Sequence, residues 1–100
     1  MILYSVTCNI DPAVHNDWFA YMKTKHIPDV LASGCFCGHK MYQILTTQEE
    51  GELSYSIQYF CNSMDEFNLY QQQFAKKLQA EHSQKFGDKV LAFRTLLETV

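Results

Sequence analysis

The segment Ile2-Leu3-Tyr4-Ser5-Val6-Thr7-Cys8-Asn9-Ile10 alternates between two sets of side chains, one of which is almost entirely large and apolar. Side chains on a β-strand point to opposite faces in turn, so this pattern predicts a strand with one buried face. The same alternation returns at 53–60, which reads Leu-Ser-Tyr-Ser-Ile-Gln-Tyr-Phe. Two such segments predict a sheet whose two faces differ in chemistry.

Helical signals follow each of these strands. Asp11 is suited to be an N-cap with Pro12 as the first helical residue, and Ser63 with Glu66 forms a capping box before a second helix. In the first helix, Val14, Trp18, Tyr21 and Met22 recur at helical spacing and are expected to face the sheet. In the second, the expected inward-facing residues are Met64, Phe67, Gln71, Phe74 and Leu78.

Proline and glycine divide the rest of the chain. Pro28 has no backbone N–H to donate, so we expect the first helix to kink or restart near residues 26–27. Gly34 and Gly87 are suited to the left-handed residues that end helices. A second strand is expected near 35–47, a hairpin tip at 49–52, and a last strand over 89–98.

The resulting order is βαββαβ in one domain, residues 1–100. Right-handed crossovers place both helices on one face of a four-stranded antiparallel sheet, which is an α+β, ferredoxin-like architecture. The chain is 47% hydrophobic, which is sufficient to build one core without disulfides. We therefore expect the four cysteines to be free thiols.

Composition and charge exclude several classes of function. The net charge is -3 and no basic run is present, which argues against nucleic acid as a partner. No window approaches the roughly 20 apolar residues of a membrane span, and the N-terminus lacks the pattern of a signal peptide. The expected location is therefore the cytoplasm, with no membrane partner.

The face of the sheet opposite the helices carries the most informative pattern. Its positions in the two clearly alternating strands are Leu3, Ser5, Thr7, Asn9, Ser54, Ser56, Gln58 and Phe60, none of which is charged. We expect a second copy of the chain to cover this face and to enclose a partly wet cavity, with Ser56 and Gln58 as ligand-binding residues. The alternative is a polar face exposed to solvent. The sequence does not decide on which face of the sheet the Arg94 side chain lies. If it points into the cavity, it would hold a carboxylate.

Several motifs together resemble a known family. They are His26-Ile27-Pro28-Asp29-Val30-Leu31-Ala32-x-Gly34, Tyr55-Ser56-Ile57-Gln58-Tyr59, Gln79-Ala80-Glu81-His82-x-x-Lys85-Phe86-Gly87 and Ala92-Phe93-Arg94-Thr95. The chain resembles an uncharacterised family of short bacterial proteins of unknown function. That family is similar to the dimeric α+β barrel superfamily, which includes cofactor-independent monooxygenases, lactone isomerases, haem-degrading enzymes and amino-acid-sensing domains. The resemblance implies a fold and homodimerisation, and it does not imply a particular reaction.

His26 and His82 are the candidate catalytic residues. In several enzymes of that superfamily, a histidine on or after the first helix lies at the mouth of the cavity. The resemblance implies that His26 is the histidine at the comparable place in this sequence. It is either such a residue or a cap of the following turn, with Asp29 nearby to orient it. His82 faces inward, either as a general base or as a core histidine bonded to a backbone carbonyl.

Three functional hypotheses follow. The first is a small-molecule site in a homodimeric barrel, used for binding or for catalysis without a cofactor, with His26, His82 and Arg94 as polar wall. The second is a regulatory or interaction module whose sheet face mediates dimerisation. The third is a metal site at Cys35, Cys37 and His39, which is disfavoured because ligands two residues apart on one strand lie about 6.6 Å apart. The sequence alone does not decide whether the protein is an enzyme.

Overall fold

The computed structural model describes residues 1–46 and 51–100. Its strands are β1 (Ile2–Ile10), β2 (Gly38–Gln43), β3 (Leu53–Cys61) and β4 (Val90–Glu98). Its helices are α1 (His15–Tyr21), α2 (Ile27–Ala32), α3 (Met64–Tyr70) and α4 (Lys76–Phe86), with short helical turns at Pro12–Val14, Met22–His26, Gln71–Ala75 and Gly87–Lys89. Of the expected hairpin tip, Glu49 and Glu50 lie outside the described residues.

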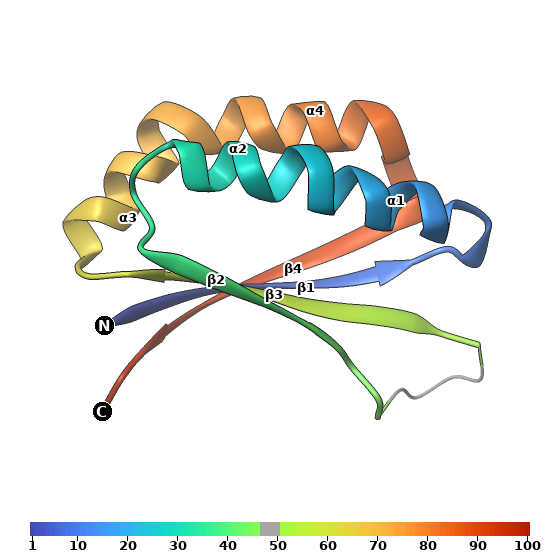
Figure 1. Cartoon of the computed structure of the whole chain (residues 1–100), viewed down its shortest axis with the longest axis horizontal. Helices are drawn as coiled ribbons and strands as arrows, with labels where there is room; N and C mark the ends of the chain where they lie inside the picture. Colours follow the sequence, from blue (N-terminus) through green and yellow to red (C-terminus); the bar gives the residue numbers. More distant parts are fainter. Residues whose placement is uncertain (47–50) are drawn as a thin grey trace.

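The strands form one antiparallel sheet in the order β2-β3-β1-β4. Both helical segments lie on the same side of this sheet, and the opposite side is uncovered (Figure 1). The predicted ferredoxin-like βαββαβ architecture is confirmed. No helix within residues 1–46 and 51–100 is both long enough and apolar enough to cross a bilayer.

The first helical segment begins and ends as the sequence predicts. The side chain of Asp11 accepts a hydrogen bond from the backbone N–H of Ala13, and Pro12 occupies the first turn. Residues Met22–His26 form a π-helical turn, after which α2 starts at Ile27 with Pro28 in its first turn. The restart expected near Pro28 is thus a change of helix type rather than a break. Gly34 ends the segment with φ of 78°.

Two details of the sequence prediction are wrong. The second strand is shorter than 35–47, because Cys35 and Phe36 are consecutive and both buried, which an alternating strand does not allow. In the second helical segment Met64 and Gln71 are exposed, and Tyr70 takes the inward position instead. The π-helical turn Gln71–Ala75 turns fewer degrees per residue and brings Ala75 into the core.

The core lies between the helices and the sheet. Trp18 and Ile57 are fully buried there. An aromatic cluster fills one end of the core, built from Tyr4, Phe36, Tyr59, Phe67 and Tyr70. Burial of these large side chains is the main favourable contribution to folding, at about 25 cal/mol per Å² of apolar surface.

Replacing Ile57 by alanine should lower the free energy of unfolding by about 2 to 5 kcal/mol, since the side chain is fully buried in β3 and its removal leaves a cavity. Urea unfolding at one fixed protein concentration measures the change. The control is Leu45→Ala, because Leu45 is 86% exposed and its truncation should cost less than about 0.5 kcal/mol. Equal costs for the two variants would contradict this placement of the core.

Candidate functional site

The two histidines predicted to be catalytic lie beside each other between the helices and the sheet. His26 ends the π-helical turn and His82 lies on α4, with ring centroids 5.7 Å apart in an edge-on arrangement. The indole Nε1–H of Trp18 donates a hydrogen bond of 3.1 Å to Nε2 of His82. The partner of His82 is therefore a tryptophan side chain, in place of the backbone carbonyl that the sequence suggested.

His26 does not cap the turn that follows it. It occupies the N-cap position of α2 without a side-chain capping bond, and its buried Nδ1 has no hydrogen-bond partner within residues 1–46 and 51–100. Burial, with a further contribution from His82, lowers the pKa of His26 to about 4. Burial also lowers the pKa of His82, and the nearby Arg94 guanidinium adds to that effect. Both rings are consequently neutral at pH 7.

Arg94 lies on the helix side of the sheet. It pairs with Val6 across β4 and β1, and Val6 packs against the core, so the two side chains share the inner face. Arg94 and both histidines line a cavity of about 30 Å³, which holds only a water molecule or two. The structure thus brings three of the predicted polar residues together, around a space too small for an organic ligand.

The other predicted site residues lie elsewhere. Asp29 is on the outer surface of α2, where it pairs with Lys25 rather than orienting His26. Ser56 and Gln58 pair with Thr7 and Ser5 on the uncovered face of the sheet. The three residues therefore do not share a site with the histidines in a single copy of the chain.

The suggested metal ligands do not form a cluster. Cys35 is buried, whereas Cys37 and His39 are exposed, and all four cysteines are free thiols. Within the part of the chain that the structure describes, no group of three or more His, Cys, Asp or Glu side chains is arranged to hold a metal ion.

The uncovered face of the sheet, called the open face below, carries almost no charge and combines small polar side chains with large apolar ones. By strand register its residues are Leu3, Ser5, Thr7, Asn9, Gly38, Lys40, Tyr42, Ser54, Ser56, Gln58, Phe60, Leu91, Phe93, Thr95 and Leu97. Lys40 is the one charged residue among these described positions. On β4, Leu91, Phe93 and Leu97 are 55%, 58% and 46% exposed. Several exposed apolar groups along one strand are typical of a protein interface.

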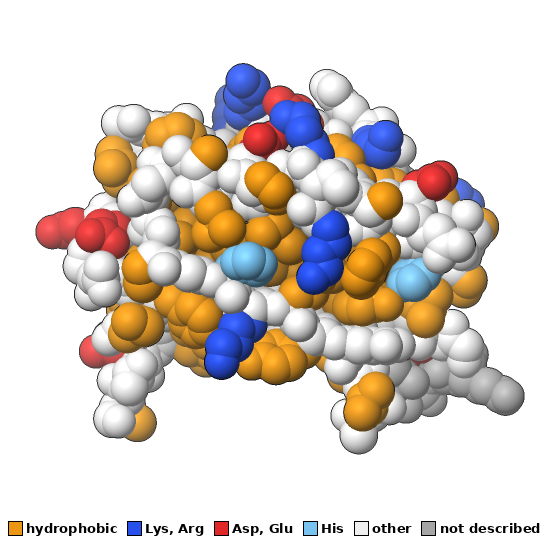
Figure 2. Space-filling model, in the orientation of Figure 1, with side chains coloured by type: hydrophobic (Ala, Val, Ile, Leu, Met, Phe, Trp, Pro, Cys, Tyr) orange, Lys and Arg blue, Asp and Glu red, His pale blue; other side chains and the backbone are white. Residues whose placement is uncertain are grey.

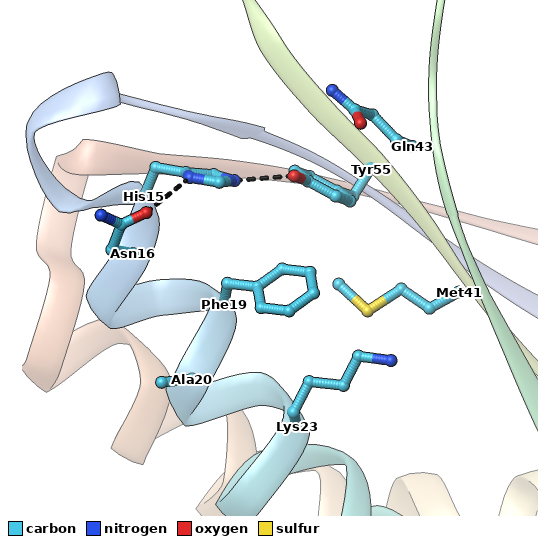
Figure 3. A pocket seen from close by; sticks show the side chains of 8 residues that line it. All are labelled: His15, Asn16, Phe19, Ala20, Lys23, Met41, Gln43 and Tyr55. Atoms are coloured by element: carbon cyan, nitrogen blue, oxygen red, sulfur yellow. Dashed lines mark hydrogen bonds between the residues drawn. The ribbon is translucent and has the colours of Figure 1, made fainter.

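A larger space lies on the helix side of the sheet, between α1 and the strands β2 and β3 (Figure 3). This space, called the α1 cleft, has a volume of about 500 Å³. Its lining residues are His15, Asn16, Phe19, Ala20, Lys23, Met41, Gln43 and Tyr55. The side chains of Phe19 and Met41 point toward each other across it from the helix and from β2 (Figure 3).

A histidine–tyrosine pair forms one wall of the α1 cleft. Nε2 of His15 lies 2.7 Å from the hydroxyl oxygen of Tyr55, and Nδ1 lies 3.3 Å from the amide oxygen of Asn16 (Figure 3). In the tautomer with the proton on Nδ1, the imidazole donates to the Asn16 oxygen and accepts the hydrogen of the Tyr55 hydroxyl at Nε2. In this tautomer the imidazole is placed to take the proton of the phenol.

The α1 cleft has a basic character. The ammonium group of Lys23 lies 5.6 Å from the centre of the Phe19 ring, and none of the described residues lining the cleft is acidic. Figure 2 shows this face of the molecule, where hydrophobic side chains form a band between the helices and the sheet. Basic and histidine side chains border the band, and the acidic side chains visible in this view lie away from it.

The sequence patterns singled out neither His15 nor Lys23, and they gave Tyr55 only as part of an alternating strand and of a family motif. A usable signal was present, because His15, Trp18, Phe19 and Met22 follow the i, i+3, i+4, i+7 spacing of one helix face. That spacing places His15 on the side of the helix that contacts the sheet.

Comparison with known proteins now identifies the family. Residues 1–100 match the family model described as "Domain of unknown function (DUF4286)". The chain belongs to this family. No curated protein matches the sequence. The DUF4286 match covers the whole βαββαβ domain, so the α1 cleft and the open face both lie within it.

Solved structures share the fold of this DUF4286 domain at low sequence identity. An ethyl tert-butyl ether d (EthD) family protein from Bacillus halodurans C-125 is 14% identical, with a TM-score of 0.68 and full coverage of both chains. A dimeric ferredoxin-like protein from an uncultured marine organism is 12% identical, with a TM-score of 0.56, covering 99% of this chain and 95% of that one. The de novo designed protein Foldit4 is 8% identical, with a TM-score of 0.52 over 99% and 98% of the two chains.

The buried His26 predicts a loss of stability in acid. The unfolded chain protonates this imidazole near its ordinary pKa of 6.5, and the folded chain only near 4. Between these values the unfolded state binds more protons, so the free energy of unfolding falls as pH falls, by about 2 to 3 kcal/mol in all. Urea unfolding from pH 7 to pH 4 should show a shallower slope for His26→Gln than for the wild type. Equal slopes would contradict a neutral, buried His26.

Proposed function

We propose that this protein is a homodimeric small-molecule-binding domain whose ligand occupies the α1 cleft. The proposal rests on the volume of that cleft and on the chemistry of the residues that line it. Its volume of about 500 Å³ falls in the usual range for organic ligands, roughly 300 to 1,000 Å³. Apolar walls with a few convergent polar groups are typical of such sites.

The contacts of the cleft support a preformed site. The Tyr55 ring packs 5.3 Å from Trp18 and 5.9 Å from Phe19, measured between centroids, and its hydroxyl is bonded to His15. Trp18 is fully buried, so the wall it supports has little freedom to move. A ligand would meet fixed groups, which lowers the entropy lost on binding.

Homodimerisation through the open face is the second part of the proposal. A second copy is the occupant that best matches this face, because a surface whose one charged residue among the described positions is Lys40 can meet its own copy with little repulsion between like charges. One structural neighbour is itself described as a dimeric ferredoxin-like protein. The interface would bury the exposed Leu91, Phe93 and Leu97 side chains and would bring Ser56 and Gln58 of the two copies together.

The cytoplasm is the compartment we propose. Four free thiols, one of them exposed at Cys37, suit a reducing environment.

A regulatory or interaction module is the second candidate function. The observation in its favour is the cavity around His26, His82 and Arg94, which at about 30 Å³ has no room for a substrate. In that case the open face would be the whole functional surface and the α1 cleft would remain empty. Binding at the cleft separates the two candidates.

The neutral aromatic probe 2-naphthol should bind in the α1 cleft, and ¹H–¹⁵N chemical-shift mapping should place the largest changes in α1, β2 and β3. Ala20 lines the cleft, so Ala20→Phe should fill it and weaken binding at least tenfold. The control is Ala80→Phe on the exposed side of α4, which adds the same side chain away from the cleft. Unsaturable shifts, or equal binding by both variants, would favour the interaction module.

Wild-type protein should sediment at micromolar concentration as a species of twice the 11.6 kDa chain mass. Phe93→Glu and Leu97→Glu should each shift it to monomer, because a carboxylate would be buried without a partner in the interface. The control Leu69→Glu changes an exposed leucine on α3 and should leave the dimer intact. A stable wild-type monomer under these conditions would refute dimerisation.

A further inference from the structure

We propose that the α1 cleft is an acid–base catalytic site, in which Tyr55 removes a proton from the carbon next to the carbonyl of a small aromatic or apolar 2-oxo acid. The inference deepens the proposed function and rests on it, since it requires a ligand in the cleft. It is carried by three residues that line the cleft: Tyr55, His15, whose imidazole is hydrogen-bonded to the Tyr55 hydroxyl, and Lys23.

The hydrogen bonds of His15 allow Tyr55 to act as a proton acceptor in one tautomer. With the proton of His15 on Nδ1, directed at the Asn16 oxygen, Nε2 holds a free electron pair at 2.7 Å from the tyrosine oxygen. As Tyr55 takes a proton from a ligand, its own proton passes to Nε2. The resulting imidazolium keeps its Nδ1–H bond to the Asn16 oxygen. Asn16 would thus orient His15, His15 would act as the base, and Tyr55 would accept the proton of the ligand.

Burial and ring packing hold the Tyr55 side chain in one place. Its side chain is nearly buried, at 7% exposure for the residue, and its ring is packed against Trp18 and Phe19. Tyr55 nevertheless is one of the residues that line the cleft. A rigidly held acceptor loses little free energy to reorganisation when the proton moves.

Lys23 and the apolar walls define the substrate class. Lys23 makes no ion pair among the described residues and lies above the Phe19 ring, so its charge is available to an anion. The Phe19 ring and the Met41 thioether face each other across the cleft, which suits a flat apolar group (Figure 3). An aromatic 2-oxo acid would fit these contacts, with its carboxylate at Lys23 and its aromatic ring between Phe19 and Met41.

The reaction step balances without an added oxidant or cofactor. The C–H bond beside the carbonyl breaks, and its electron pair forms the carbon–carbon double bond of an enolate. The proton moves to the Tyr55 oxygen while the tyrosine proton moves to His15. Return of a proton to the enolate oxygen gives the enol, and return to carbon restores the keto acid. Lys23 stabilises the negative charge that develops during the step.

Phenylpyruvate is the probe, because it carries a carboxylate, an aromatic ring and exchangeable protons beside its carbonyl. In D₂O, loss of its CH₂ signal in ¹H NMR should be faster with wild-type protein than in buffer alone. Tyr55→Phe should reduce the catalysed rate about 100-fold. The matched control Tyr42→Phe removes a hydroxyl from the open face, outside the cleft, and should keep the wild-type rate.

Two further variants separate positioning from binding. His15 acts through Tyr55 and is a positioning residue, so His15→Gln should lower kcat while leaving KM unchanged. Lys23→Gln should raise KM, because it removes the charge that holds the carboxylate. A purely structural role for His15 would instead change both constants together with the thermal stability.

The outcomes distinguish this inference from the proposed function. If phenylpyruvate shifts the cleft resonances without exchange above the buffer rate, the catalytic inference fails and the binding function stands. If exchange persists in Tyr55→Phe, or if 2-naphthol binds and phenylpyruvate does not, the inference is likewise overturned. If neither compound binds, both proposals fail.

Discussion

Trp18 is the side chain on which the arrangement of this molecule depends. It is fully buried on α1, its indole N–H is bonded to His82 on α4, and its ring packs against Tyr55 on β3. One residue therefore connects both helical segments with the sheet. His82 lines the small histidine cavity and Tyr55 lines the α1 cleft, so Trp18 contacts one lining residue of each space.

Most of the fold follows from local patterns that the sequence shows directly. The alternation in β1 and β3, the Asp11–Pro12 start, the Ser63 capping box and the glycine ends at Gly34 and Gly87 all correspond to observed boundaries. The deviations occur where a residue departs from regular periodicity. The π-helical turns change which helical residues face inward, and Cys35 and Phe36 enter the core from a connection rather than from a strand.

The candidate site was harder to predict, because it depends on contacts between residues far apart in the chain. His26, His82 and Arg94 line one small cavity, but helical spacing predicted an inward position only for His82, and the face of the sheet that carries Arg94 was left open. The His15–Tyr55 bond joins residues 40 positions apart. No local spacing indicates such a pair, although the helical face of His15 indicates the direction in which its side chain points. Side-chain volumes decide where space remains, and they act only after the layers are packed.

The register of β3 has a consequence for how this domain can change over time. Tyr55 faces the α1 cleft and its neighbour Ser56 faces the open side, so adjacent positions of one strand serve two separate surfaces. A slip of one residue in that strand would exchange the phenol for a serine and turn the aromatic ring outward. Substitutions in β3 can therefore change the α1 cleft or the open face separately. An insertion or deletion inside this strand would disrupt both surfaces at once.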